Sequence, residues 1–390
     1  MRKWVAGKIG DLLTLQRGFD ITKKIQSDGL YPVVSSGGIS SYHNEFKVIG
    51  PGVVIGRKGT LGTAFYLPSN YWPHDTSLWV KDFKGNDPKF IYFFLKSLPL
   101  ERLDSGSSNP TLNRNIVHQI DTLKPPLEDQ KKIAAVLSAL DAKIECNNRI
   151  NAELEAIAKT LYDYWFVQFN FPDHNGQPYK SSGGKMVYKP TLKRQIPAGW
   201  HHSNILAVAD LFGGGTPTKK SAEYWNGDIP FFTPTDADGN IFKFSTKDSI
   251  TENGLKNSST RLFEENTVFI TARGSVGKLV LAGNKMAMNQ SCYAFRSKKG
   301  ISHTYLFFLV KELINHLKVK SSGSVFDSIV SNDIECTSLI IPDPAVIKKF
   351  ALLADPVFER IANATRENQH LTQLRDWLLP MLMNGQVIVA

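Results

Sequence analysis

VVIGRKGTLG, residues 53–62, returns as VFITARGSVG at residues 268–277, an offset of 215. FIYFFLK at residues 90–96 returns as YLFFLVK at residues 305–311 with the same offset. Solenoid repeats have periods of about 20 to 50 residues, so a period this long, used twice, marks whole domains instead. The chain has 390 residues, which is enough for two domains with cores of their own.

Each copy leads into a segment with helical periodicity. Apolar or small residues recur at alternating spacings of four and three through residues 133–165 and again through residues 350–378. This spacing is typical of a heptad seam. Asn147, Asn151 and Asn368 occupy seam positions, and we interpret them as polar residues that fix register rather than as catalytic groups.

Proline predicts where these helices start. Pro356 stands in the second helical segment, and proline fits the first turn of a helix but breaks its interior. We therefore expect a short helix followed by a long one of about 28 residues, roughly 42 Å, in each copy. Asp355 would cap the second long helix, and Pro380 and Gly385 would end it.

The expected fold is α/β (α+β), with a pseudo-two-fold internal repeat. Two similar domains would be joined by two long antiparallel coiled-coil helices, which pack on each other. The predicted boundaries are 1–125 for the first domain, 126–169 for the central helical region, 170–199 for a Gly/Ser/Pro/Lys-rich surface linker, 200–343 for the second domain and 344–390 for the C-terminal helical region.

The two predicted domains are unequal. Pro32–Ser35 matches Pro230–Thr233 at an offset of 198 instead of 215, so the second domain carries about 17 additional residues. The formal net charge of +10 is also uneven, since residues 1–125 carry +6 and residues 195–343 carry +1. A basic balance favours a polyanionic partner, although ordinary solubility charge would also explain it. Two copies that differ in this way should bind different targets.

Composition excludes several classes. No apolar run approaches the length of a membrane span, and the N-terminus lacks the apolar core of a signal peptide. The three cysteines are scattered without metal-ligand spacing, so we expect neither disulfides nor a metal site. These features predict a cytoplasmic protein that does not bind a membrane.

Motifs for catalysis are missing from the sequence. It contains no phosphate-binding loop of the Gly-x-x-x-x-Gly-Lys-Ser/Thr type, no Gly-x-Gly-x-x-Gly dinucleotide loop, and no Asn/Asp-Pro-Pro-Tyr motif of adenine methylation. The metalloprotease and nucleophile-elbow motifs are absent too. We therefore expect no catalytic residues in this chain.

Loops supply the candidate binding residues instead. In the turns at residues 57–62 and 273–277, glycine permits close approach to a phosphate, and neighbouring cations and hydroxyls could hold it. Hairpin geometry alone would equally explain these glycines. Asn and Gln side chains pair with adenine but also cap strands. The candidate DNA contacts are Ser35, Ser36, Arg57, Lys58, Thr60, Asn109, Arg114, Thr216, Thr218, Lys219, Lys220, Thr233, Thr235, Arg273, Ser275, Asn289, Gln290 and Ser324.

Longer strings resemble a known family, the specificity subunit of type I restriction–modification systems. The strings are PPLEDQKKIAAVLSALDAKIECNNRI (125–150), LYDYWFVQFNFPDHNGQPYKSSGGKM (161–186), IPAGW (196–200), GGGTPTKKSAEYWNGDIPFFTPTD (213–236) and LRDWLLPMLMNGQV (374–387). Together they extend the resemblance over essentially the whole chain.

The resemblance implies two target recognition domains, each of which binds one half of a bipartite, asymmetric site on double-stranded DNA. The helices would fix the spacing and dock two DNA adenine methyltransferase subunits, and the assembly can add restriction (translocase–nuclease) subunits. S-adenosylmethionine would bind the methyltransferase partner, so no cofactor is expected in this chain. Two alternatives remain open from the residues alone: a coiled-coil adaptor that binds proteins, and a self-sufficient DNA methyltransferase or nuclease.

Overall fold

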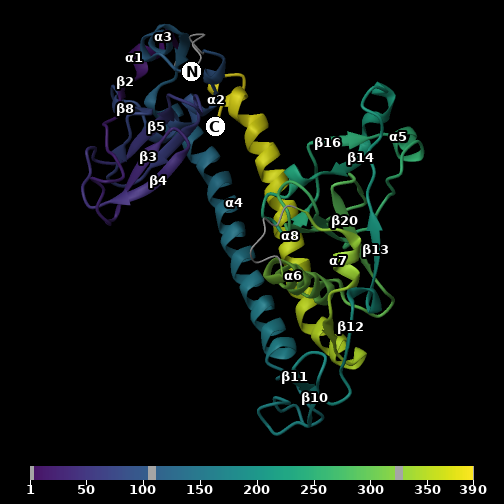
Figure 1. Cartoon of the computed structure of the whole chain (residues 1–390). Coiled ribbons are helices and arrows are strands. Elements are labelled where there is room, and N and C mark those ends of the chain that lie inside the picture. Colours follow the sequence, from purple (N-terminus) through teal and green to yellow (C-terminus); the bar gives the residue numbers. More distant parts are fainter. Residues whose placement is uncertain (1–3, 104–110, 321–327, 390) are drawn as a thin grey trace. The chain divides into compact units, whose positions relative to one another are not determined.

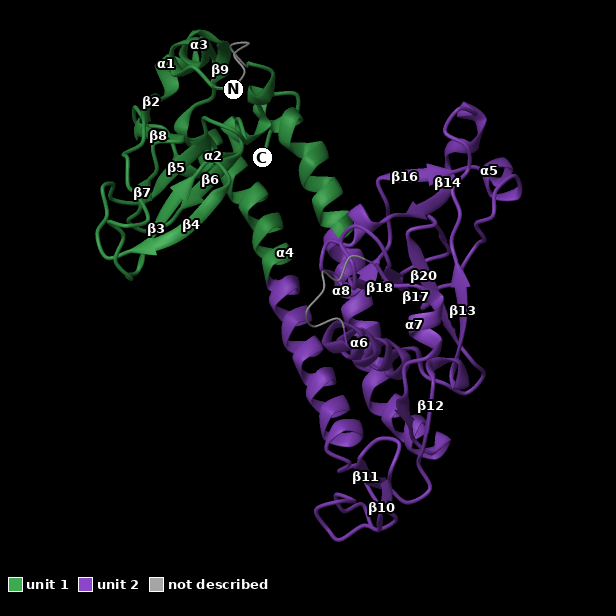
Figure 2. Cartoon of the chain, viewed as in Figure 1, with its two compact units in different colours: residues 1–145, 369–390 green, residues 146–368 purple. Residues whose placement is uncertain are grey.

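The computed structural model describes residues 4–103, 111–320 and 328–389. The chain divides into two compact units. Unit 1 comprises residues 1–145 and 369–390, and unit 2 comprises residues 146–368 (Figure 2). Each unit therefore holds one mixed domain together with a part of both long helices.

Unit 1 is built on two small sheets (Figure 1). The four-stranded sheet has the order β2 (Thr14–Arg17), β8 (Ser77–Asp82), β5 (Gly52–Gly56), β6 (Ala64–Leu67). The three-stranded sheet has the order β4 (Gly38–His43), β3 (Tyr31–Ser35), β7 (Trp72–Pro73). β5 is buried along its whole length because it lies inside the larger sheet.

Helix α2 (Pro88–Ser97) covers the core of unit 1. Asp87 caps it by accepting a hydrogen bond from the Phe90 backbone N–H at 2.8 Å, and Pro88 suits the first turn. Its buried face presents Phe90 and Phe94 to the core. The remaining elements of this unit are β1 (Val5–Lys8), which pairs with β9 (Asp121–Lys124), α1 (Ile9–Leu12), the 3₁₀ turn Leu100–Arg102 and α3 (Arg114–Gln119).

Unit 2 repeats this plan with additions. Its larger sheet has the order β13 (Ala209–Gly213), β20 (Cys292–Ser297), β17 (Val268–Thr271), β18 (Leu279–Ala282), β15 (Phe242–Lys243). Its smaller sheet has the order β16 (Asp248–Ile250), β14 (Trp225–Phe232), β19 (Ala287–Met288). The other elements are α5 (Glu252–Lys256), α6 (His303–Lys320), α7 (Ser331–Glu335), and β12 (His201–Ser203) paired with β21 (Leu339–Ile341).

Backbone pairing confirms the internal repeat. Val33 pairs with Trp72 in parallel between β3 and β7, and Phe231 pairs with Ala287 in the same way between β14 and β19. These partners are related by the sequence offsets of 198 and 215. The additional residues of the second copy supply β15, which extends the larger sheet by pairing with β18. The predicted insertion therefore becomes an extra edge strand.

The two long helices are each continuous, so the predicted break is wrong. α4 runs over Leu127–Tyr162 and α8 over Pro344–Met383, about 54 and 60 Å of helix at 1.5 Å per residue. Pro356 lies inside α8, where it removes one hydrogen bond to the carbonyl four residues earlier, that of Leu352. Leu352 is 72% exposed, so the proline lies next to the solvent-facing side of α8. Tertiary packing thus outweighs the local effect of proline.

The predicted ends of α8 need a related correction. Asp355 is not a cap, because it lies within the helix and accepts a hydrogen bond from Ser302 Oγ at 2.5 Å. Pro380 lies in the last turns of α8 rather than beyond it. Gly385 lies two residues after Met383, the final helical residue, and has a φ of +74°, as expected for a glycine past a helix end.

The helix seam is polar where predicted. In unit 2, Asn147 is 2% exposed and donates to Glu367 Oε2 at 2.7 Å and to Asn368 Oδ1 at 2.9 Å. Asn151 donates to Thr365 Oγ1 at 3.2 Å. Residue numbers rise on α4 as they fall on α8, so the two helices pack antiparallel there. The three asparagines therefore have the interhelical role that the heptads predicted.

The stretch between the copies is largely exposed, as expected, but contains local structure. β10 (Met186–Lys189) and β11 (Arg194–Pro197) form a hairpin. Phe171, before the hairpin, stacks on Trp200, after it, with ring centroids 5.0 Å apart, and both are buried in the core of unit 2. α4 continues into a short π-helical segment, Asp163–Val167. Among the described residues, no helix combines the length and apolar character needed to span a membrane.

Candidate nucleic-acid interface

Three segments of unit 1 meet at the end of strand β5. The backbone N–H groups of Arg57 and Lys58 both donate to the carbonyl of Thr76 at 3.0 Å. The Leu112 N–H donates to the carbonyl of Arg57 at 2.9 Å. In the turn that follows, Gly59 and Gly62 have φ values of +76° and +72°. These conformations favour glycine, so turn geometry explains both glycines without a ligand.

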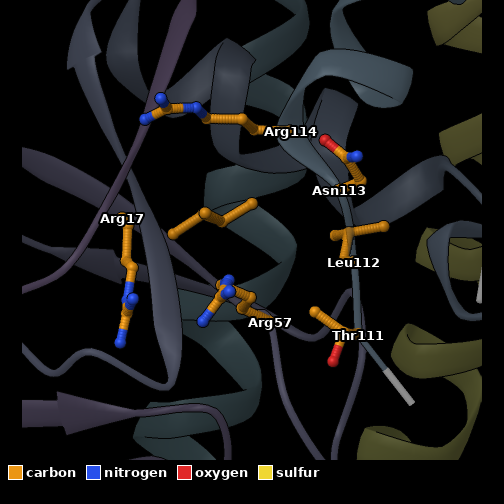
Figure 3. Close-up of a pocket in the computed structure, with 7 residues that line it drawn as sticks. Arg17, Arg57, Thr111, Leu112, Asn113 and Arg114 are labelled. Atoms are coloured by element: carbon orange, nitrogen blue, oxygen red, sulfur yellow. The ribbon is translucent and has the colours of Figure 1, made fainter. Parts of the chain in front are cut away.

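A cationic hollow opens beside this junction. It has a volume of about 360 Å³, and three arginine side chains from separate segments line it (Figure 3). Arg17 comes from the end of β2, Arg57 follows β5, and Arg114 begins α3. The full lining is Arg17, Arg57, Leu78, Thr111, Leu112, Asn113 and Arg114. We call this feature the arginine hollow.

One carboxylate borders the arginines. Asp75 Oδ2 accepts a hydrogen bond from Arg17 at 2.7 Å, and Arg57 donates to the backbone carbonyl of Asp75 at 3.4 Å. Burial would raise the pKa of the Asp75 carboxyl, but the hydrogen bond from Arg17 and the charges of His74 and Lys58 lower it overall. Asp75 therefore stays ionised and offsets one of the three positive charges.

The guanidinium of Arg57 is affected by burial and by the neighbouring positive charges. Its pKa is lowered, first by partial burial and then by the positive charges of Arg17 and Arg114, with Asp75 acting in the opposite direction. Like charges held close together favour an anion between them. The arginine hollow therefore has the electrostatic character of an anion site.

The other predicted residues of unit 1 divide into two kinds. Lys58 and Thr60 are exposed in the turn after β5 and are free to reach a ligand. Ser36 is only 6% exposed, and its Oγ donates to the Thr76 carbonyl at 2.5 Å, so it has a structural role. Ser35 Oγ donates to the Gly38 carbonyl at 3.1 Å and closes the hairpin between β3 and β4.

Unit 2 gathers its predicted residues around the equivalent strand ends. Thr216 Oγ1 donates to Gln290 Oε1, which joins two of them. The Asn289 N–H donates to the Phe232 carbonyl at 2.9 Å, and its side chain accepts from the Ser291 N–H at 3.1 Å. Asn289 thus caps the local turn, which is the alternative that its residue type left open.

The remaining predicted residues of unit 2 are mostly accessible. Thr233 Oγ1 lies 2.8 Å from Thr235 Oγ1 and donates to Asp236 at 2.7 Å. The exposed members of the set are Thr218, Lys219, Lys220, Thr235, Arg273, Ser275 and Gln290. Asn109 and Ser324 lie outside the described residues.

Two charged residues in or beside the arginine hollow escaped the prediction. Arg17 and Asp75 lie far from Arg57 in sequence, and strand pairing in the β2–β8–β5 sheet brings them together. Gln-Arg-Gly at the end of the first short apolar run was the available signal, but one arginine after a strand is too common to single out. No sequence pattern around Asp75 indicated a binding site.

His74 and Asp75 also lie near Asp20, with ligand-type atoms within 4.8 Å of one another. His74 Nδ1 lies 2.9 Å from Thr76 Oγ1, and Asp75 pairs with Arg17 at 2.7 Å. Both groups thus have protein partners, and we assign this cluster no metal.

Comparison with known proteins places the chain in a family. The model of the type I restriction modification DNA specificity domain matches residues 1–156 and 197–373, so one domain type occurs twice. The chain belongs to this family, and its role is that of a specificity subunit in a type I restriction–modification system.

The individual relatives have low sequence identity to this chain, but the alignments cover most of both chains. The chain is 26% identical to the MjaIX type I restriction enzyme specificity subunit of Methanocaldococcus jannaschii, over 77% of this chain and 69% of the relative. It is 23% identical to the HindI specificity subunit of Haemophilus influenzae, over 71% of each. The crystal structure of a type I restriction–modification S subunit from M. genitalium matches 98% of this chain and 96% of its own length, with a TM-score of 0.62 and 16% identity. That structure supports the fold.

Proposed function

We propose that each mixed domain binds one half of a bipartite, asymmetric site on double-stranded DNA. The proposal rests on one observation: the two domains share a fold but carry different side chains at equivalent loop positions. Lys58 and Arg273 occupy the same place, because each donates its backbone N–H to the carbonyl of an equivalent residue, Thr76 or Ser291. Arg57, in contrast, is replaced by Ala272. Similar scaffolds with different contact residues suit two different half-sites.

The paired helices then have two proposed roles. They set the distance between half-sites, and they dock two DNA adenine methyltransferase subunits, with restriction subunits joining the same assembly. Chemistry would reside in the partners: S-adenosylmethionine would bind the methyltransferase, which takes the target adenine out of the DNA stack. This chain supplies sequence selection.

Mapping methylated adenines tests the proposal. The chain would be co-expressed with its methyltransferase in a host free of other adenine methylation, and the modified positions would be read by sequencing that detects N6-methyladenine. We expect two short defined sequences separated by a fixed number of undefined base pairs. A single uninterrupted motif would contradict the two-domain proposal, and cells without this chain provide the control.

Arg57→Ala tests DNA contact in unit 1. The affinity of the complex for its duplex would be measured over a range of salt concentrations. Each phosphate that loses its cation lowers the slope of log affinity against log salt by about one, so Arg57→Ala should flatten it by that amount. Lys131→Ala, an exposed lysine on α4 that pairs with Glu128 at 3.5 Å, removes the same charge as a control. Equal slopes for wild type and Arg57→Ala would remove Arg57 from the interface.

A further inference from the structure

The arginine hollow carries an excess of positive charge that the described residues do not balance. Arg17, Arg57 and Arg114 line it, and among residues 4–103, 111–320 and 328–389 Asp75 is the one carboxylate hydrogen-bonded to any of them. Each guanidinium has five donor hydrogens, so the bond from Arg17 to Asp75 leaves further donors for a ligand. Figure 3 shows the three side chains arranged around the same space.

The chemistry of the hollow selects a phosphate over a neutral base. Guanidinium groups bind phosphate oxygens through two parallel hydrogen bonds, with both charge and geometry matched. A neutral base would accept hydrogen bonds but leave the repulsion among the arginines uncompensated. Leu78 and Leu112, each 1% exposed, form the apolar wall behind the arginines.

The equivalent hollow of unit 2 lacks this character. Strand register places Gly213 opposite Tyr293 where unit 1 has Arg17 opposite Leu78. The offset of 215 likewise replaces Arg57 by Ala272, and Ser331 begins α7 where Arg114 begins α3. This second hollow, of about 650 Å³, is lined by Gly213, Tyr293 and Ser331 together with Asp210, Arg296, Lys298 and Glu335, among other residues.

The charges of the second hollow cancel. Arg296 pairs with Asp210 at 3.0 Å. Lys298 and Glu335 also line the hollow, so its lining holds two cations and two carboxylates. An anion would gain little there, because Arg296 is already paired and the lining holds as many carboxylates as cations. The same place in the fold is therefore net positive in unit 1 and balanced in charge in unit 2.

We infer that the arginine hollow binds a backbone phosphate of the DNA half-site read by unit 1, and that unit 2 has no counterpart. This inference rests on the proposed DNA-binding function. It adds Arg17 to the binding residues and assigns the electrostatic anchoring unequally to the two domains. Phosphate contacts fix register and carry no base information, so the hollow positions the first domain and the exposed loops around it select the bases.

The test uses the full chain with its methyltransferase and a duplex that contains the mapped site. A neutral methylphosphonate replaces one backbone phosphate at a time across both half-sites. The test variant is Arg17→Gln with Arg114→Gln, since both side chains are exposed. The matched control is Arg296→Gln with Lys298→Gln, which removes two charges from the second hollow. Thermal unfolding of each variant checks that the fold is retained.

We expect one methylphosphonate in the first half-site to weaken wild-type binding about tenfold, the scale of a lost charge-assisted hydrogen bond. The test variant should bind unmodified DNA about tenfold more weakly and lose its sensitivity to that one position. The control variant should keep its sensitivity to the methylphosphonate at that position. This coupling between one phosphate and two arginines identifies the contact.

Three results would overturn the inference. The methylphosphonate and arginine effects could multiply independently at every position, the control variant could lose the same sensitivity, or 7-deazaguanine rather than methylphosphonate could couple to the arginines. If the wild-type complex binds its site specifically and any of these three results is found, the inference fails but the proposed function is retained. Absence of specific binding by the wild type refutes the proposed function itself.

Discussion

At the scale of single residues, unit 2 holds an acid in an unusual setting. Glu312 on α6 accepts a hydrogen bond from Tyr162 Oη at 3.0 Å. Burial raises the pKa of Glu312, more than the Tyr162 hydrogen bond and the charges of His316 and Arg194 lower it. The folded protein therefore favours the protonated acid, whereas the unfolded chain ionises near the ordinary glutamate pKa of about 4.3.

Glu312→Gln should consequently stabilise the protein at neutral pH. Below the ordinary pKa both states hold the proton, so the variant and the wild type should unfold at similar temperatures. As the pH rises, the unfolded chain releases its proton first, and the wild type loses stability until the folded pKa is passed. Glutamine keeps an oxygen for Tyr162. Melting temperatures from pH 4 to 8 measure the difference, and Glu153→Gln, exposed on α4, is the control. A constant difference across this range would contradict the raised pKa.

Residue-level reasoning found two of the three arginines that line the arginine hollow. Arg57 stood out because it lies in the repeated turn, and Arg114 also stood among the candidate DNA contacts. Arg17 and Asp75 did not, because only the hydrogen-bonded sheet brings them within reach of Arg57. Burial misled the prediction for Ser36, since nothing in its sequence context separates a buried serine from an exposed one.

At the scale of elements, the heptads predicted both long helices and their polar seam positions. They could not show that α8 continues past Pro356, because the rule for proline is local while the packing of Phe350, Ala354 and Phe358 in one core is tertiary. The extra strand of the second domain could not be predicted from the sequence either. Offsets located the insertion, but the partner strand of β15 depends on three-dimensional pairing.

Pro356→Ala separates a continuous helix from a broken one. In a helix interior, alanine is more favourable than proline by about 3 kcal/mol, so the substitution should raise the free energy of unfolding by up to that amount. If a new helix began at Pro356, the proline would be favourable and its loss neutral or destabilising. Pro344 is the first residue of the same helix and supplies the matched control. Denaturant unfolding of Pro344→Ala and Pro356→Ala gives the comparison.

At the scale of the whole molecule, the repeat was the most readable feature. Its offsets of 215 and 198 reappear as equivalent strand pairs, because the same backbone pairing supports both domains. The chemical difference between the domains was visible in the sequence as net charge, yet its concentration in one hollow was not. Charge totals add over a surface, whereas a binding site depends on which cations the fold brings together.

The proposed role of the helices as a spacer yields the last prediction. Seven residues inserted into α4 near Arg149 and into α8 near Ala364 would preserve the heptad seam and lengthen the pair by about 10.5 Å. Since base pairs rise about 3.4 Å each, the recognised site should gain about three undefined base pairs between its halves. Both half-sequences should stay the same, because neither domain is altered.

Methylation mapping of the lengthened protein measures this change directly. The control receives the same seven residues after Gly183, in the exposed stretch between the copies, and should recognise the original spacing. Insertion into α4 alone should abolish methylation rather than shift it, because the seam contacts of Asn147 and Asn151 would lose their partners on α8. An unchanged spacer in the doubly lengthened protein would mean that something other than these helices sets the distance between half-sites.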